Sequence, residues 1–135
     1  MRIVIDTNLI IASRFKSRSG SSRILEMCTE EKVEAVYSPQ IKNENLFILE
    51  KVRPGSDFIH RVIRFYSRAK LVRPREKVKV CEDPDDDKYL DAALAGKADY
   101  IISNDRHLLE HDGWRGIRIV RPGKFLSELK KGGKV

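Results

Sequence analysis

The sequence predicts an α/β fold, a three-layer α/β/α sandwich around a mostly parallel sheet of about five strands. Short β-branched segments alternate along the chain with longer amphipathic segments, and parallel neighbouring strands need helical crossovers between them. The 135 residues, 41% of them hydrophobic, can bury one core and leave little for a second. We therefore expect one domain over residues 1–131 and a frayed tail at 132–135.

The first half of the chain predicts two strands, each followed by a helix. A β-branched run after Met1 ends at Asp6 and is typical of a buried strand. Gly20-Ser21-Ser22 offers N-caps for one helix, and Ser38-Pro39 offers an N-cap and a first residue for another. The predicted elements are a strand at 2–5, a helix from about 20 to 28, a strand at 33–37 and a helix from 39 to about 52.

The middle of the chain combines a further helix with two short strand candidates. Asp57 can cap a helix that carries an arginine stripe, Arg61, Arg64 and Arg68, at positions i, i+3 and i+7. Residues 71–72 and 78–80 are short apolar segments. We expect one of them to be the third parallel strand.

The last third of the chain repeats the alternation. Tyr100-Ile101-Ile102-Ser103 is a strong strand that ends at Asn104-Asp105, so a second apolar strand ends at an acid. The other predicted elements are a helix from 85 to about 96, a short helix at 107–111, a strand at 117–120 and a helix at 122–130.

The charges are segregated along the chain. The net charge is +7, and ten basic residues but only two acids lie between Lys51 and Lys79. Six acids and one base follow between Glu82 and Asp91. The basic excess suggests a polyanionic partner, although excess lysine also serves solubility. No apolar run approaches the ~20 residues of a membrane span, so we expect no membrane association.

The two cysteines, Cys28 and Cys81, form no CxxC pair and stand near no histidine. Such a pattern cannot make a thiolate zinc site and suits a reducing compartment. We therefore expect a cytoplasmic protein in which both cysteines are small core residues.

Acidic residues mark one edge of the predicted sheet. In parallel sheets the ligand site lies beyond the carboxyl ends of the strands, where Asp6 and Asp105 fall. The helix that opens at residues 85–87 begins at the same edge, and Glu44 can lean towards it from its own helix. Two carboxylates about 5 Å apart repel by roughly 3 kcal/mol at an effective dielectric of 20, which a divalent cation would offset. All-oxygen ligation favours Mg²⁺ or Mn²⁺ over zinc.

Each of these acids also has a purely structural interpretation. Asp6 and Asp105 could cap the turn or short helix that follows each of them. The acids at 85–87 could complement a helix dipole, and Glu44 could be a solvated helix residue. Independent caps need not all lie on one edge of one sheet, so the combination favours a metal site.

Four motifs extend over nearly the whole chain: residues 3–8 (IVIDTN), Ser38-Pro39 with Glu44, residues 83–90 (DPDDDKYL) and residues 100–105 (YIISND). In this order they resemble the PIN-domain family, especially the VapC-like toxins of bacterial and archaeal toxin–antitoxin pairs. Asn45 departs from that pattern, because the family usually has leucine after the middle glutamate.

The resemblance implies a metal-dependent endoribonuclease that cleaves single-stranded RNA by metal-activated water. Its acidic pocket would consist of Asp6, Glu44, Asp87 and Asp105, with Asn8 and Ser103 orienting these carboxylates. Asp87 is chosen because its distance to Ser103 in the sequence matches the family pattern, and Asp86 is the alternative.

The resemblance also implies a homodimer and, for a toxin, a small antitoxin partner. Arg61, Arg64 and Arg68 could bind the RNA backbone, or they could form a solvated helix face. Two other function classes stay open: a receiver-like, Mg²⁺-dependent phosphoacceptor module, and a catalytically idle module that binds RNA or an antitoxin. Loss of cleavage in Asp6→Asn or in EDTA would discriminate the nuclease from both.

Overall fold

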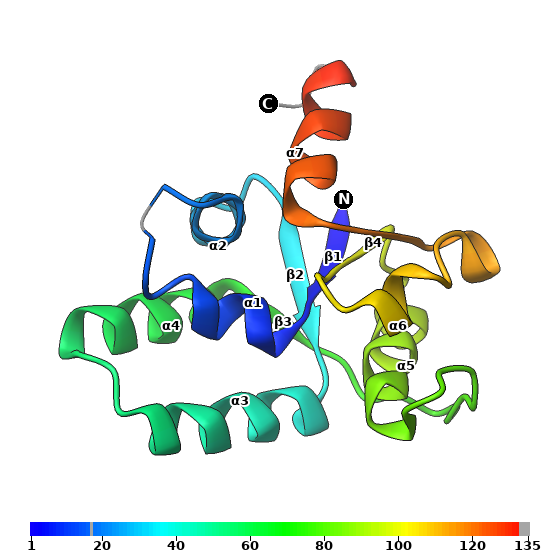
Figure 1. Cartoon of the computed structure of the whole chain (residues 1–135), viewed down its shortest axis with the longest axis horizontal. Coiled ribbons are helices and arrows are strands. Elements are labelled where there is room, and N and C mark those ends of the chain that lie inside the picture. The colour runs from blue at the N-terminus through cyan, green and yellow to red at the C-terminus, as the bar shows by residue number, and fades with distance from the viewer. Residues whose placement is uncertain (17, 133–135) are drawn as a thin grey trace.

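A parallel β-sheet lies at the centre of the computed structural model, which describes residues 1–16 and 18–132 (Figure 1). Within these residues the sheet has five strands in the order β3-β2-β1-β4-β5, and every neighbouring pair is parallel. The strands are β1 (Arg2–Ile5), β2 (Glu34–Tyr37), β3 (Lys70–Leu71), β4 (Tyr100–Ile102) and β5 (Arg118–Val120). The predicted fold class is confirmed. Of the two candidates for the third strand, residues 71–72 and 78–80, the first overlaps β3.

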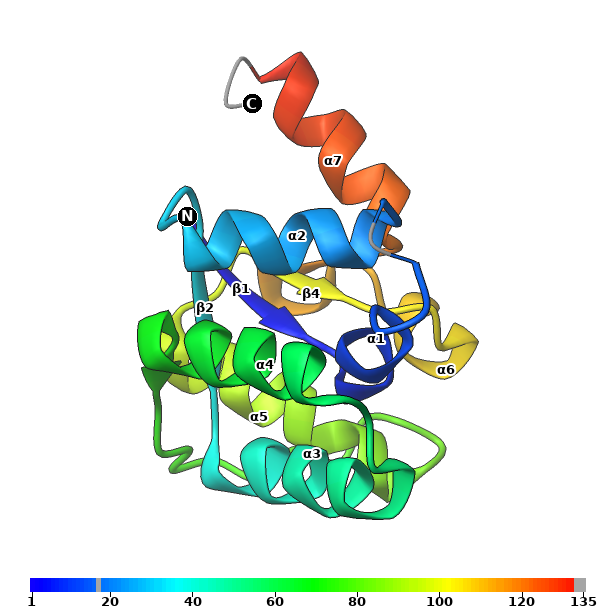
Figure 2. The same ribbon diagram turned by 90° about the vertical axis from the view of Figure 1, so that its left-hand side faces the viewer.

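Helices cover both faces of this sheet. In Figure 2, α2 (Gly20–Thr29) and α4 (Ser56–Arg68) lie side by side in front of the strands. The hydrophobic core on this face of the sheet also includes side chains of α1 (Thr7–Ala12) and α7 (Pro122–Lys131). Helices α5 (Asp87–Gly96) and α6 (Arg106–Leu109) pack on the opposite face. The long helix α3 (Pro39–Val52) contacts both α1 and α5.

The strand residues alternate between the two faces, as a period of two requires. Ile3 and Ile5 of β1 belong to the core cluster beneath α2 and α4, whereas Val4 belongs to the cluster beneath α5. Gly96 brings α5 close to the sheet: a Cβ atom added there would lie 2.8 Å from Cγ2 of Val36. Both faces of the sheet are therefore buried, which explains why the strand sequences are almost continuously apolar.

Local differences from the sequence predictions concern short segments. Helix α1 was not predicted, because six residues are too few to show a helical period. Residues 78–80 form no strand; they lie along α5, where the Val78 amide donates to Asp91 Oδ1 at 2.8 Å. The helix predicted from residue 85 starts as a 3-10 turn, η1 (Pro84–Asp86), and becomes α-helical at Asp87.

A second 3-10 turn, η2 (Trp114–Gly116), precedes β5. The prediction of a frayed tail falls mostly on residues 133–135, which lie outside the described residues. None of the helices in the described part of the chain is long and apolar enough to cross a bilayer.

Candidate active site

Asp6 and Asp105 meet at the carboxyl edge of the sheet. They follow β1 and β4, which are hydrogen-bonded neighbours, and the Asp6 amide donates to the Ile102 carbonyl at 3.0 Å. Ser103 joins the two acids, because its hydroxyl donates to Asp6 Oδ2 at 2.8 Å and accepts from the Asp105 amide at 2.9 Å. The prediction that these two acids share one edge is confirmed by the strand order.

Asp6 is a buried carboxylate with several hydrogen-bond donors. It is 3% exposed, and its Oδ1 accepts from the Asn8 amide at 2.9 Å and from the Tyr89 hydroxyl at 3.2 Å. Burial raises its pKa above the ordinary aspartate value, and the charge of Asp105 adds to this effect, while the hydrogen bonds oppose it. Asn8 acts here through its backbone, since the residue itself is exposed.

Asp86 shares the electrostatic field of these two acids. Burial and, after it, the charges of Asp105, Asp83 and Asp6 together raise the pKa of its carboxyl to about 6. Like charges within interaction range are the pattern that a bound cation relieves. Asp86 thus lies within electrostatic range of the two acids at the strand ends, Asp6 and Asp105.

Asp87 holds the backbone of the segment that precedes η1. Its Oδ1 accepts from the backbone amides of Cys81 at 2.8 Å and of Val80 at 3.2 Å. The residue is buried, at 6% exposure, beneath the segment that precedes η1. The Asp87 carboxylate thus anchors a loop to the start of α5.

Glu44 reaches the same edge of the sheet but is already paired. Its Oε1 accepts from the Thr7 hydroxyl at 3.1 Å, and its Oε2 lies 2.5 Å from Lys88 Nζ. The Lys88 side chain is 2% exposed and also contacts Asp85 Oδ2 at 3.0 Å. The ammonium of Lys88 therefore compensates Glu44 from within the protein.

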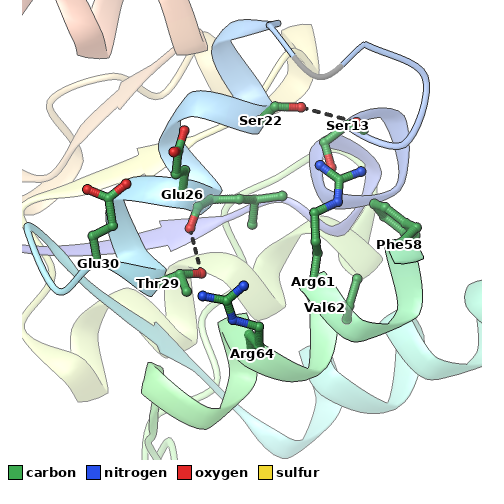
Figure 3. A pocket seen from close by; sticks show the side chains of 10 residues that line it. Ser13, Ser22, Glu26, Thr29, Glu30, Phe58, Arg61, Val62 and Arg64 are labelled. Carbon is green, nitrogen blue, oxygen red and sulfur yellow. Dashed lines mark hydrogen bonds between the residues drawn. The ribbon is translucent and has the colours of Figure 1, made fainter. Parts of the chain in front are cut away.

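The arginine stripe of α4 lies apart from these acids. Arg68 Nη1 is 3.3 Å from Glu31 Oε1, and Glu31 precedes β2 at the amino edge of the sheet. Arg61 and Arg64 line a cleft between α2 and α4 that also contains Glu26 and Glu30 (Figure 3). Carboxylates of α2 and of the turn after it therefore lie close to all three arginines of the stripe.

The acids at the carboxyl edge fit a hard divalent cation by their chemistry. The ligand atoms that they offer are carboxylate oxygens, and the pKa values of Asp6 and Asp86 are raised first by burial and also by the charge of Asp105. The ligands are not assembled in advance: over residues 1–16 and 18–132, no three Asp, Glu, His or Cys side chains converge on one metal position. A cation would have to draw these carboxylates together.

Comparison with known proteins decides the family. A model described as PIN domain matches residues 2–107. The chain belongs to the PIN domain family. The uncharacterized protein MJ1680 of Methanocaldococcus jannaschii is 30% identical to this PIN protein, and the alignment covers 97% of this chain and 93% of the relative.

Two solved structures share the PIN fold of this chain. The crystal structure of VapBC2 from Rickettsia felis, bound to a DNA fragment from its promoter, superposes with a TM-score of 0.60 at 13% identity. That match covers 88% of this chain and 97% of the other. PAE2754 from Pyrobaculum aerophilum gives a TM-score of 0.59 at 13% identity, over 97% and 90% of the two chains.

Sequence reasoning missed three side chains of this PIN domain site. Tyr89 and Thr7 link Asp6 to Glu44, because the Tyr89 hydroxyl lies 3.0 Å from Thr7 Oγ1. Lys88 is the buried cation that pairs with Glu44 and Asp85. The only signal for it was its position as the single base in a run of six acids.

Proposed function

We propose that this PIN domain is a metal-dependent endoribonuclease that cleaves single-stranded RNA. The observation that carries the proposal is the group formed by Asp6, Asp86 and Asp105 at the carboxyl edge of the sheet, where open α/β sheets bind their ligands. Mg²⁺ or Mn²⁺ bound there would supply Lewis acidity that polarises a phosphodiester and acidifies water.

The side chains around the group have separable roles in this proposal. Ser103 and Tyr89 fix the orientation of the Asp6 carboxylate through hydrogen bonds to its two oxygens. Asp105 and Asp86 carry the remaining ligand oxygens. We propose Asp86 in place of Asp87 as the third acid, since the charges of Asp105 and Asp6 act on Asp86, whereas Asp87 Oδ1 holds the Val80 and Cys81 amides.

Glu44 completes the negative edge but keeps its charge balanced by Lys88. This ion pair also joins α3 to the start of α5, so it fixes the distance between two of the elements that surround the acids. In the proposed enzyme Glu44 is therefore a positioning residue, and it becomes a ligand only if Lys88 moves away.

We also propose a toxin role with a small antitoxin partner, and assembly as a homodimer. Support for the partner comes from the fold shared with VapBC2 from Rickettsia felis. The sequence motifs typical of VapC-like toxins, set out above, point the same way.

The test is cleavage of a labelled single-stranded RNA by the wild-type protein and by Asp6→Asn, purified in parallel. We expect cleavage by the wild type in Mg²⁺ or Mn²⁺, no cleavage in EDTA, and no cleavage by a folded Asp6→Asn protein. Equal activity of the two proteins would show that a contaminant or another site cleaves the RNA.

A further inference from the structure

A basic segment precedes the acidic residues at the start of α5, and its side chains take no part in the candidate active site. It comprises residues 73–79, whose cations are Arg73, Arg75, Lys77 and Lys79. All four residues are exposed, and they alternate in the sequence with Pro74, Glu76 and the buried Val78. In the described part of the chain, no carboxylate lies within ion-pair distance of any of the four.

The segment follows α5 towards the acids. Arg73 and Arg75 line a cleft with Leu94 and Ala95 in the second half of α5. Further along, the Val78 amide donates to Asp91, and the Val80 and Cys81 amides donate to Asp87, one helical turn closer to the start of α5. From Ala95 to Asp87 the helix rises by about 12 Å, so the cations are spread over roughly that length.

The end of the segment reaches the acidic group. Burial raises the pKa of the Cys81 thiol to about 12, and the charges of Asp87, Asp86 and Asp105 contribute to that shift. Glu76, the one acid within the segment, is held by Arg115 through two contacts of 3.0 Å. The segment thus carries four cations outside any ion pair of the described residues and continues to the start of α5, where Asp86 is the N-cap residue.

We propose that this basic segment binds the phosphate backbone of a single-stranded RNA and guides it to the acids at the carboxyl edge. The inference rests on the proposed nuclease function for its substrate, but it concerns a separate set of residues. A negative catalytic edge repels RNA unless nearby cations hold the backbone, and these are the exposed cations nearest to Asp86 along the chain.

The structure favours this segment over the arginine stripe of α4. Arg68 is paired with Glu31, and Arg61 and Arg64 share their cleft with Glu26 and Glu30. Arg73 and Arg75 also share a cleft with two acids, Glu76 and Asp91, but Glu76 is held by Arg115 and Asp91 accepts from the Val78 amide. Asp87 and Asp91 acquire a role in this proposal, because their carboxylates hold the backbone of residues 78–81 against α5.

The test compares two double variants of the full chain in EDTA, where cleavage does not interfere. RNA affinity is measured by fluorescence anisotropy with a labelled single-stranded oligonucleotide at several salt concentrations. Each phosphate contact contributes about 0.7 to the salt slope for single strands. Lys77→Gln/Lys79→Gln should therefore lower the slope by about 1.4 and weaken binding about 25-fold at 0.1 M salt.

The matched control is Arg61→Gln/Arg64→Gln, which removes the same charge from α4. It should weaken binding by no more than about twofold, since Arg61 and Arg64 share their cleft with Glu26 and Glu30. Equal losses in the two variants would overturn the proposal, because they would show binding by net charge alone. The proposal also fails if Lys77→Gln/Lys79→Gln keeps its affinity for RNA but loses affinity for an aspartate-rich peptide, because the lysines would then bind an acidic peptide and not RNA.

Substitutions of Asp91 offer a second test, in which net charge and the anchoring role predict opposite changes in RNA affinity. Asp91→Asn keeps an oxygen acceptor for the Val78 amide, and Asp91→Ala removes it. Loss of one negative charge alone would tighten RNA binding in both. We expect weaker binding in Asp91→Ala only, since the lysines lose their anchored position; equal affinities in the two variants would contradict the anchoring role.

These measurements separate the segment from the nuclease proposal. RNA binding that depends on Lys77 and Lys79, without cleavage in either Mg²⁺ or Mn²⁺, would refute the nuclease and retain the segment. Cleavage that depends on Asp6 with an unchanged KM in the lysine variant would retain the nuclease and refute the segment.

Discussion

Replacing Asp86 by asparagine should stabilise the protein at neutral pH. Its pKa is raised from 3.8 to about 6, chiefly by burial and next by the charge of Asp105. The shift is about two units, and at 1.36 kcal/mol per unit the ionised carboxylate destabilises the fold by about 3 kcal/mol. Because Asp86 is partly exposed, solvent screening reduces this to about 1–2 kcal/mol. Asp86 makes no capping hydrogen bond at α5, so asparagine loses none.

The gain must depend on pH in a defined direction. The raised pKa means that the folded protein holds a proton between about pH 4 and 6 that the unfolded chain releases, so wild-type stability falls as the pH rises through this window. The advantage of Asp86→Asn should therefore be full above about pH 6 and vanish towards pH 4. At neutral pH the melting temperature should rise by about 3–8 °C.

Denaturant unfolding in EDTA at pH 4 and at pH 7.5 measures the effect. Asp87→Asn is the matched control, and it should give no gain, because Asp87 already accepts two backbone hydrogen bonds. A gain in the Asp87 variant, or equal stability of wild type and Asp86→Asn at pH 7.5, would refute the placement of Asp86 among the repelling acids.

Three further substitutions test other parts of the structure. Lys88→Met should cost about 2–4 kcal/mol of unfolding free energy by leaving Glu44 unpaired, and adding Glu44→Gln should restore part of it; no loss in urea unfolding would contradict the ion pair. Ser103→Ala should weaken Mn²⁺ binding about 10–100-fold in calorimetric titration, whereas unchanged affinity would show that the hydroxyl orients nothing. Gly96→Ala should cost about 1–3 kcal/mol, because its methyl would overlap Val36; a neutral melting temperature would contradict the close approach of α5.

The parts of the fold that depend on long patterns could be predicted from the sequence. Two β-branched strands that end at Asp6 and Asp105 predicted a parallel sheet with both acids at one edge, and the strand order agrees. Parallel strands share their carboxyl edge whatever the details of the loops. That rule makes the pair predictable without coordinates.

The rest depended on geometry that no sequence period encodes. Our proposal of Asp86 in place of Asp87 concerns a junction of 3-10 and α-helix, where one residue turns a side chain by about 100°. The pairing of Glu44 with Lys88 joins residues 44 positions apart, and nothing local signals it. Val78 and Val80 are β-branched like strand residues, but their amides donate to carboxylates of α5 in place of a neighbouring strand.

The position of a bound cation tests the central claim most directly. Anomalous diffraction from a crystal soaked in Mn²⁺ locates the ion without any assumption about activity. We expect a single dominant peak between the carboxylates of Asp6, Asp86 and Asp105. A peak coordinated by Asp87, or no peak at the carboxyl edge of the sheet at millimolar Mn²⁺, would contradict the account.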